Sequence, residues 1–146
     1  MSSDDIYREI ILDYYRNPRN FGYIENPDIV FRDSNPLCGD ELEIFINIKD
    51  NKVSDVKFGG KGCAISQASA SILTEMIMGK DLEYLKKLSK EDILENLGLV
   101  ALGPARLKCA LLSLKVLKSG VYSYITEKLH DTVSAKKIKD QTANLF

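Results

Sequence analysis

Three cysteines and one aspartate are the residues of this sequence whose chemistry stands out. Cys38 and Asp40 lie in the stretch NPLCGDE, Cys63 follows the glycine-rich stretch GGKG, and Cys109 lies in PARLKCALL. Tetrahedral zinc accepts a set of thiolates and a carboxylate, and iron in an iron–sulfur cluster is bound mainly by thiolates. No two cysteines have the CxxC spacing of a zinc ribbon. The four residues therefore predict a metal site only if the fold brings them together.

Cys38 and Asp40 lie in a predicted turn. Free cysteine is among the most buried residue types, so a core position is the competing interpretation of any single cysteine. Pro36 and Gly39 around Cys38 predict an exposed turn, which disfavours that interpretation. Asp40 has its own competing interpretation as an ordinary turn aspartate. Gly39 would let the backbone bend so that both side chains face one ion.

Cys109 fits two interpretations equally well. Leu107 and Ala110 are typical of a buried helix face, where a cysteine is inert. Arg106 and Lys108 are cationic neighbours, which favour the reactive thiolate form. The local pattern leaves both interpretations open.

A predicted β-hairpin brings Cys38 and Cys63 to one end of a sheet. Apolar and polar residues alternate over 41–49 and again over 53–60, with a turn at 50–52 between them. In an antiparallel hairpin the start of the first strand lies beside the end of the second. Cys38 precedes the one and Cys63 follows the other, so we expect the two thiols to be neighbours.

Helices are expected to cover one face of this sheet. A weaker strand is predicted over 28–33. Helical spacing predicts a first helix that ends at Asn17-Pro18 and a second over 64–78. Two short helices are expected next: Asp81 caps one, and Ser89 with Asp92 caps the other, which ends at Gly98. The last two predicted helices run from Pro104 to Gly120 and over 121–130. Cys63 directly precedes the helix over 64–78, whose positive end favours a thiolate. This order predicts one α+β domain with a three-stranded antiparallel sheet over residues 1–130, followed by a polar, flexible tail over 131–146.

Composition excludes several classes of function. The chain of 146 residues is long enough for a core without metal or disulfide staples, and its net charge of -1 gives no bias toward nucleic acid. No apolar stretch is long enough to span a membrane and the N-terminus is acidic, so we expect a cytoplasmic protein with reduced thiols. GGKG lacks the remainder of a phosphate-binding motif. The single histidine, His130, lies in a predicted surface position, which argues against a cysteine hydrolase.

The chain resembles the iron–sulfur cluster assembly scaffold family of the IscU, SufU and NifU N-terminal type over roughly residues 5–130. The resemblance rests on the segments NPRNFG, CGDE, KFGGKGCAISQASAS and PARLKCALLSLKVL. It implies the same α+β fold with a three-stranded antiparallel sheet. It also implies that Cys38, Cys63 and Cys109 hold a nascent cluster or a zinc ion, and that Asp40 ligates the metal or governs cluster release.

The resemblance implies a scaffold rather than a stand-alone enzyme. Such a scaffold accepts sulfur from a pyridoxal-phosphate cysteine desulfurase, binds iron and passes a transient 2Fe–2S cluster to apo iron–sulfur proteins. Cys38 or Cys109 would accept the sulfur as a persulfide, with Arg106 and Lys108 assisting. The alternative is a zinc-bound sulfurtransferase that activates its desulfurase without building a cluster, and a structural zinc protein is a third. Self-association into a homo-oligomer is left open.

The sequence also departs from the family branches. Lys108 occupies the position where the IscU branch has a metal-ligating histidine, and Arg106 matches the Pro-Ala-Arg pattern of the SufU branch. A protonated lysine cannot ligate a metal, so Asp40 becomes the expected fourth ligand. The long insertion of SufU proteins between the second and third cysteines is missing. Residues 102–106 differ from the Leu-Pro-Pro-Val-Lys stretch of the IscU branch, so dependence on a dedicated chaperone is not expected.

Overall fold

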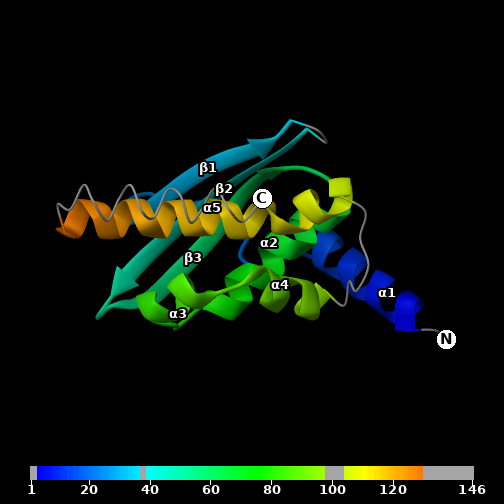
Figure 1. The fold of residues 1–146 in the computed structure, drawn as a ribbon, viewed down its shortest axis with the longest axis horizontal. Helices are drawn as coiled ribbons and strands as arrows, with labels where there is room; N and C mark the ends of the chain where they lie inside the picture. The colour runs from blue at the N-terminus through cyan, green and yellow to red at the C-terminus, as the bar shows by residue number, and fades with distance from the viewer. Residues whose placement is uncertain (1–2, 37–38, 98–103, 130–146) are drawn as a thin grey trace.

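The computed structural model describes residues 3–36, 39–97 and 104–129, so the predicted tail over 131–146 lies outside the described residues. Its helices are α1 (Ser3–Arg16), α2 (Ala64–Ile77), α3 (Leu82–Lys87), α4 (Lys90–Leu97) and α5 (Pro104–Leu129). Its strands are β1 (Ile29–Asn35), β2 (Asp40–Lys49) and β3 (Lys52–Lys61), and they form an antiparallel sheet in the order β1-β2-β3 (Figure 1). The predicted α+β fold is therefore confirmed. Among the described residues, no helix has the length and apolar character that crossing a membrane requires.

The sheet has one apolar face because its central strand alternates. Leu42, Ile44 and Ile46 of β2 are buried, and the residues between them are only partly buried. β3 continues this apolar face, since Phe58 lies opposite Ile44 and is also fully buried. The alternation that predicted the hairpin thus fixes which face the helices cover.

The predicted strands over 41–49 and 53–60 are confirmed, and the weaker prediction over 28–33 is a strand that runs on to Asn35. The turn between β2 and β3 is tighter than predicted. Asp50 and Asn51 have φ of 53° and 65°, and their flanking residues already pair across the hairpin. A two-residue turn with both residues left-handed matches the twist of the strands, which explains why Asp and Asn occupy it.

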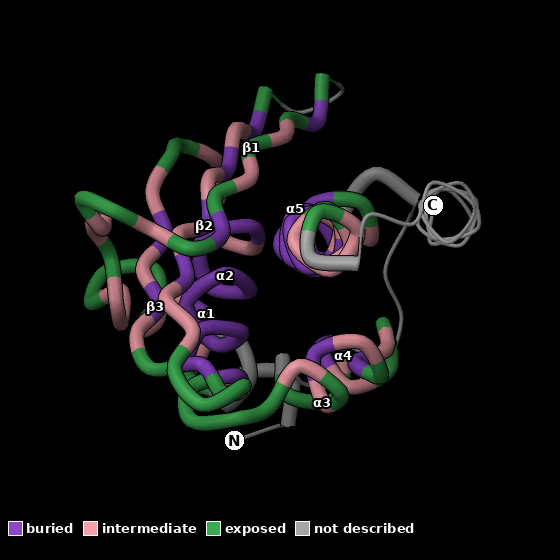
Figure 2. The backbone as a smooth tube through the Cα atoms, turned by 90° about the vertical axis from the view of Figure 1, so that its left-hand side faces the viewer, coloured by how far each residue is buried: buried purple, intermediate pink, exposed green. Residues whose placement is uncertain are grey.

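The helices lie on one side of the sheet, as Figure 2 shows in a view turned from that of Figure 1. α2 packs against β3, α5 packs against β1 and β2, and α1 packs against α2. α3 and α4 contact α5, and α4 also contacts α2. The largest fully buried side chains come from both layers and include Ile44, Ile46, Phe58, Leu73, Ile77, Leu114 and Leu117. α2 and α5 are therefore held as neighbours over the sheet.

Gly120 does not end a helix, because α5 runs through it without a break. The predicted stop at Gly120 and the separate helix over 121–130 are wrong. A Cβ atom at position 120 would lie 3.0 Å from Ile29 Cγ2 and 3.1 Å from Phe31 Cβ. Glycine costs a helix roughly 1 kcal/mol relative to alanine, and here that cost is offset by the close approach of α5 to β1.

The predicted caps of the short helices are confirmed. Asp81 accepts a hydrogen bond from the Tyr84 N–H at 2.8 Å and so begins α3. Ser89 and Asp92 bond each other reciprocally, with the Asp92 N–H donating to Ser89 Oγ and the Ser89 N–H donating to Asp92 Oδ2. The predicted end of α4 at Gly98 lies outside the described residues.

The segment NPRNFG, between α1 and β1, is held against α2 and β3. The Arg19 N–H donates to Ser71 Oγ at 2.7 Å, and the Asn20 side-chain amide donates to Thr74 Oγ1 at 3.0 Å. The Asn20 carbonyl accepts the Phe58 N–H at 3.0 Å. These bonds hold the segment against α2 and β3, away from the GGKG stretch that joins them.

Lys118 of α5 is a buried cation that makes stability depend on pH. It is 5% exposed, and its Nζ donates to the backbone carbonyl of Lys86 in α3. Burial lowers the pKa of Lys118 below its ordinary value of 10.5, and the charge of Asp92 partly opposes this shift. The unfolded chain therefore binds this proton more tightly than the folded chain. Its contribution to the unfolding free energy should rise as pH increases from the lowered pKa toward 10.5.

We expect Lys118→Met to remove this rise, because methionine fills a similar volume without a charge. Denaturant unfolding of both proteins at a series of alkaline pH values measures the difference. Tyr14 and Tyr122 act in the opposite direction, since their raised pKa values weaken stability above pH 10, but both proteins share them. Parallel pH profiles for the two proteins would contradict the role given to Lys118.

Candidate metal centre

The β2–β3 hairpin places Asp40 beside Cys63. Glu41 at the start of β2 pairs with Lys61 at the end of β3, so Asp40 lies next to the chain that leaves β3. The Cys63 N–H donates to Asp40 Oδ1 at 2.9 Å, and the Cys63 thiol donates to Asp40 Oδ2 at 3.7 Å. The carboxylate belongs to a residue that is 1% exposed. Asp40 is therefore a buried residue at the start of β2, in contact with Cys63, and not an ordinary turn aspartate.

Cys63 is also the residue that begins α2. Its backbone is extended, with φ of -73° and ψ of 169°, and its Sγ accepts a hydrogen bond from the Ser66 N–H at 3.5 Å. A sulfur atom thus occupies the position where serine or aspartate oxygen usually caps a helix. The unpaired N–H groups and the dipole of the helix face this sulfur, which suits a ligand that carries negative charge.

Cys109 reaches the same place from α5. The Ser69 hydroxyl of α2 donates a hydrogen bond to the Ala110 carbonyl of α5 at 2.5 Å, and this bond holds the two helices together beside Cys109. One ligand atom each from Asp40, Cys63 and Cys109 lie within 4.8 Å of one another. Cys109 is 3% exposed, so it is buried, and its ligand atom lies near those of Asp40 and Cys63.

The three side chains fit a zinc ion or an iron ion. In a tetrahedral zinc site with bonds of about 2.0 to 2.3 Å, neighbouring ligand atoms are about 3.3 to 3.8 Å apart. The distance between Cys63 Sγ and Asp40 Oδ2 is already 3.7 Å. The donor set of two thiols and one carboxylate is also one that both metals accept. Small movements of the side chains would complete the geometry.

Gly62 leaves space for this group of ligands, and Gly39 provides the backbone bend before Asp40. A Cβ atom at position 62 would lie 2.6 Å from Asp40 Oδ1 and 2.5 Å from Ser66 Oγ, so no side chain fits there without displacing them. Gly39 has φ of 70°, a left-handed conformation that most residues avoid. The predicted bend before Asp40 is therefore confirmed.

The other predicted site residues are placed only in part. Cys38 and His130 lie outside the described residues, and so does the side chain of Arg106 in the first turn of α5. Lys108 is exposed, directly before Cys109 in α5. The roles of Cys38, Arg106 and Lys108 therefore stay predictions.

The described part of the site is largely enclosed. Asp40 and Cys109 are buried, and Cys63 is partly exposed. Of the two cysteines that the structure describes, Cys63 is thus the easier one for a partner to reach, although Cys38 and Cys109 were the predicted sulfur acceptors. Cys109 is buried because α2 packs closely on α5, and the spacing of residues in the sequence does not predict this tertiary contact.

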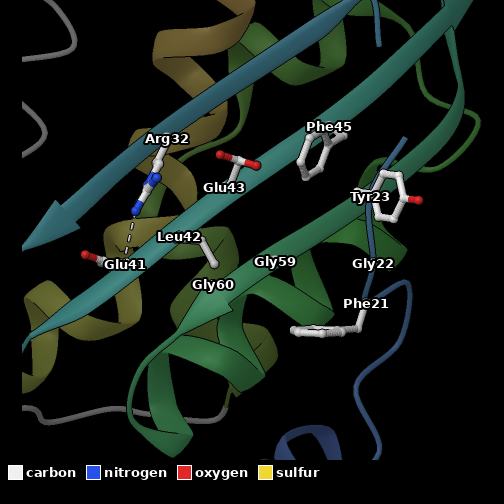
Figure 3. Close-up of a pocket in the computed structure, with 10 residues that line it drawn as sticks. All are labelled: Phe21, Gly22, Tyr23, Arg32, Glu41, Leu42, Glu43, Phe45, Gly59 and Gly60. Atoms are coloured by element: carbon white, nitrogen blue, oxygen red, sulfur yellow. Dashed lines mark hydrogen bonds and ion pairs between the residues drawn. The ribbon is translucent and has the colours of Figure 1, made fainter. Parts of the chain in front are cut away.

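A separate hollow of about 380 Å³ lies on the sheet face that the helices leave uncovered (Figure 3). Aromatic side chains from Phe21, Tyr23 and Phe45 stand around it, and Arg32 pairs with Glu41 at 3.2 Å at its edge. None of the three clustered ligand residues lines this hollow. The metal centre and the hollow are therefore different places in the fold.

Comparison with known proteins decides the family. Residues 6–131 match the family described as the NifU-like N terminal domain. The chain belongs to this family. The resemblance in the sequence to the IscU, SufU and NifU N-terminal type is thereby confirmed.

Relatives of this NifU-like domain carry two kinds of name. The protein named zinc-dependent sulfurtransferase SufU, from Bacillus subtilis strain 168, is 42% identical over an alignment of 134 residues that covers 81% of this chain and 90% of that protein. The iron–sulfur cluster assembly scaffold protein IscU 1 of Archaeoglobus fulgidus is 37% identical over 119 residues, with coverage of 82% and 76%. A solved structure from Fervidobacterium islandicum AW-1, described as a proposed SUF-system scaffold, has a TM-score of 0.71 and 36% identity, with coverage of 82% and 99%.

Two residues of the NifU-like domain's site were missed by sequence reasoning. Neither Gly62, which lies in the glycine-rich stretch GGKG, nor Ser66 was assigned a role in the site from the sequence. The spacing of a cysteine and a serine three residues later, at the start of a helix, is a capping pattern that could have indicated Ser66. The role of Gly62 depends on where Asp40 lies, which only the fold determines.

Proposed function

We propose that this protein is an iron–sulfur cluster assembly scaffold. It accepts sulfur from a pyridoxal-phosphate cysteine desulfurase, binds iron, and passes a 2Fe–2S cluster to apo iron–sulfur proteins. The observation that carries the proposal is the convergence of Asp40, Cys63 and Cys109, whose ligand atoms lie within 4.8 Å of one another. Family membership and the scaffold names of the relatives support it. We expect it to act in the cytoplasm, where thiols stay reduced.

In this proposal Cys63 and Cys109 bind the metal as thiolates, and Asp40 supplies the carboxylate. Cys38 is the further thiolate, because it lies two residues before Asp40 in the chain. Asp40 differs from the thiolates in being an oxygen ligand, which is less strongly held by iron in a cluster. An exchangeable oxygen ligand suits a protein that must release its cluster.

Sulfur would arrive by attack of a scaffold thiolate on the outer sulfur of the desulfurase persulfide. The sulfur–sulfur bond of that persulfide breaks, and the desulfurase cysteine leaves as a thiolate. A new persulfide forms on the scaffold, and two electrons from an external reductant convert its outer sulfur to sulfide. Lys108 is exposed beside Cys109 and, with Arg106, would attract the anionic sulfur group.

A zinc-bound sulfurtransferase is the second candidate function. The relative from Bacillus subtilis is named a zinc-dependent sulfurtransferase, and Lys108 occupies the position of a histidine ligand in the IscU branch. The two thiols and the carboxylate also fit zinc. In this case the protein would accept sulfur and increase desulfurase turnover without holding a cluster.

Anaerobic reconstitution with iron, cysteine, a reductant and a cysteine desulfurase separates the two functions. The scaffold forms a coloured cluster that an apo-ferredoxin can receive, and its formation is lost in Cys63→Ser and Cys109→Ser. The sulfurtransferase retains zinc, forms no cluster and raises desulfurase turnover. Wild-type behaviour of both serine variants in both assays would refute the assigned site.

A further inference from the structure

The N–H and the hydroxyl of Ser66 both bond to one residue, Cys63. Ser66 is the third residue of α2 and is 2% exposed. Its N–H donates to Cys63 Sγ at 3.5 Å, and its hydroxyl donates to the Cys63 carbonyl at 3.1 Å. Its Oγ is also 3.7 Å from Cys63 Sγ. A buried hydroxyl group thus lies within reach of a candidate metal ligand.

The other buried serines of α2 have different tasks. Ser69 donates to the Ala110 carbonyl on α5, and Ser71 accepts the Arg19 N–H from the segment before β1. Both hydroxyls therefore hold neighbouring elements in place. Among the described residues, Ser66 is the serine of this helix whose hydroxyl bonds within the metal centre.

Ser66 also lies on the side of Cys63 where the ligands gather. A single Cβ atom added at Gly62 would come within 2.5 Å of Ser66 Oγ and 2.6 Å of Asp40 Oδ1. The hydroxyl and the carboxylate therefore border the same small space. The Cys63 sulfur is 3.7 Å from each of them.

We propose that Ser66 is a positioning residue that fixes the Cys63 sulfur for metal binding. The proposal rests on the metal site of the proposed function. A metal-bound thiolate accepts hydrogen bonds and donates none. In the metal-bound state the Ser66 hydroxyl would rotate, so that its hydrogen bond goes to the Cys63 sulfur instead of the Cys63 carbonyl. The N–H and the O–H of Ser66 would then both donate to the sulfur. Such partners orient metal ligands, and their loss typically costs about 10- to 100-fold in metal affinity.

The hydroxyl should also change the electronic character of the metal–sulfur bond. Hydrogen bonds to thiolate ligands withdraw electron density from sulfur, and they help to set the properties of metal–sulfur sites. Removing the hydroxyl should therefore move the sulfur-to-metal charge-transfer absorption to longer wavelength. A residue that only packs against the helix would leave this absorption unchanged.

The test compares Ser66→Ala with Ser71→Ala in the full chain under anaerobic conditions. Ser71 is as deeply buried on the same helix, but its hydroxyl bonds elsewhere. Zinc affinity is measured by competition with a chromophoric chelator, and the charge-transfer band is measured after loading with Co²⁺. We expect Ser66→Ala to lose about 10-fold or more in zinc affinity and to shift the cobalt band, while Ser71→Ala keeps both wild-type values.

Equal affinities and equal cobalt spectra in Ser66→Ala and Ser71→Ala would overturn the role of Ser66 alone. Failure of the wild-type protein to bind either metal would overturn the metal site as well, so the two failures are distinguishable. Thermal unfolding of both variants without metal provides the folding control. The alanine in Ser66→Ala keeps the backbone N–H, so the comparison isolates the hydroxyl group.

Discussion

Replacing Asp40 with alanine is expected to lower the zinc affinity of the protein by more than the roughly 10- to 100-fold that loss of an outer hydrogen-bonding partner costs. The carboxylate is a proposed ligand itself, with Oδ2 3.7 Å from Cys63 Sγ. Its Oδ1 also holds the Cys63 N–H at 2.9 Å, so the variant loses a ligand and a support of the neighbouring ligand. A competition titration with a chromophoric chelator, under anaerobic conditions, measures the loss.

Two further variants keep this prediction testable. Asp40→Asn retains an acceptor for the Cys63 N–H but loses the charge, and it should fold normally while binding zinc at least 10-fold more weakly. Asp33→Ala is the matched control on β1, because it removes a partly exposed ion pair with Lys115 and should change stability by at most about 1 kcal/mol. Zinc affinity in Asp40→Asn equal to that of Asp33→Ala would show that Asp40 is not a ligand.

Gly62→Ala is expected to damage the metal centre by crowding it. The added Cβ would lie 2.6 Å from Asp40 Oδ1 and 2.5 Å from Ser66 Oγ, closer than real Cβ contacts. Extra atoms in a packed site cost about 1 to 3 kcal/mol. Replacing glycine restores only about 0.4 to 1 kcal/mol by restricting the unfolded chain, so the variant should be less stable than wild type. We also expect zinc affinity to fall at least 10-fold, because the displaced Asp40 and Ser66 would no longer hold the ligands in position.

Gly59→Ala is the control for Gly62→Ala. It makes the same change three residues earlier, where the added Cβ would meet only the Gly22 carbonyl oxygen at an ordinary 3.6 Å. Neither glycine has a left-handed backbone, so alanine strains the backbone at neither position. The two variants therefore differ only in the space available to the added Cβ atom. Denaturant unfolding and zinc titration of both proteins measure the effects. Indistinguishable results for the two would mean that Gly62 does not keep the site open.

The convergence of Asp40 and Cys63 could be expected from the sequence because it follows from local pattern. Strict alternation of apolar residues over β2 fixes which residues face the helices, and a tight turn fixes the register. Once the register is set, the start of β2 and the end of β3 must lie together, with Glu41 paired to Lys61. The hairpin alone therefore brings Asp40 and Cys63 together, and no contact between distant parts of the chain is needed for this.

The position of Cys109 could not be derived in the same way. It depends on how α5 packs on α2 and β1, through the Ser69 bond to Ala110 and the close approach at Gly120. The same packing explains why the predicted helix break at Gly120 is wrong: a local propensity of roughly 1 kcal/mol is outweighed by tertiary contacts. The burial of Asp40 was also missed, because turn composition indicates exposure and says nothing of a helix packed above.

The central claim is that Asp40, Cys63 and Cys109 bind one metal ion, and X-ray absorption at the zinc edge tests it most directly. The measurement uses the full chain, loaded with one equivalent of zinc without oxygen. The account predicts sulfur scatterers at about 2.3 Å together with oxygen at about 2.0 to 2.2 Å. A first shell that contains only nitrogen and oxygen would contradict it.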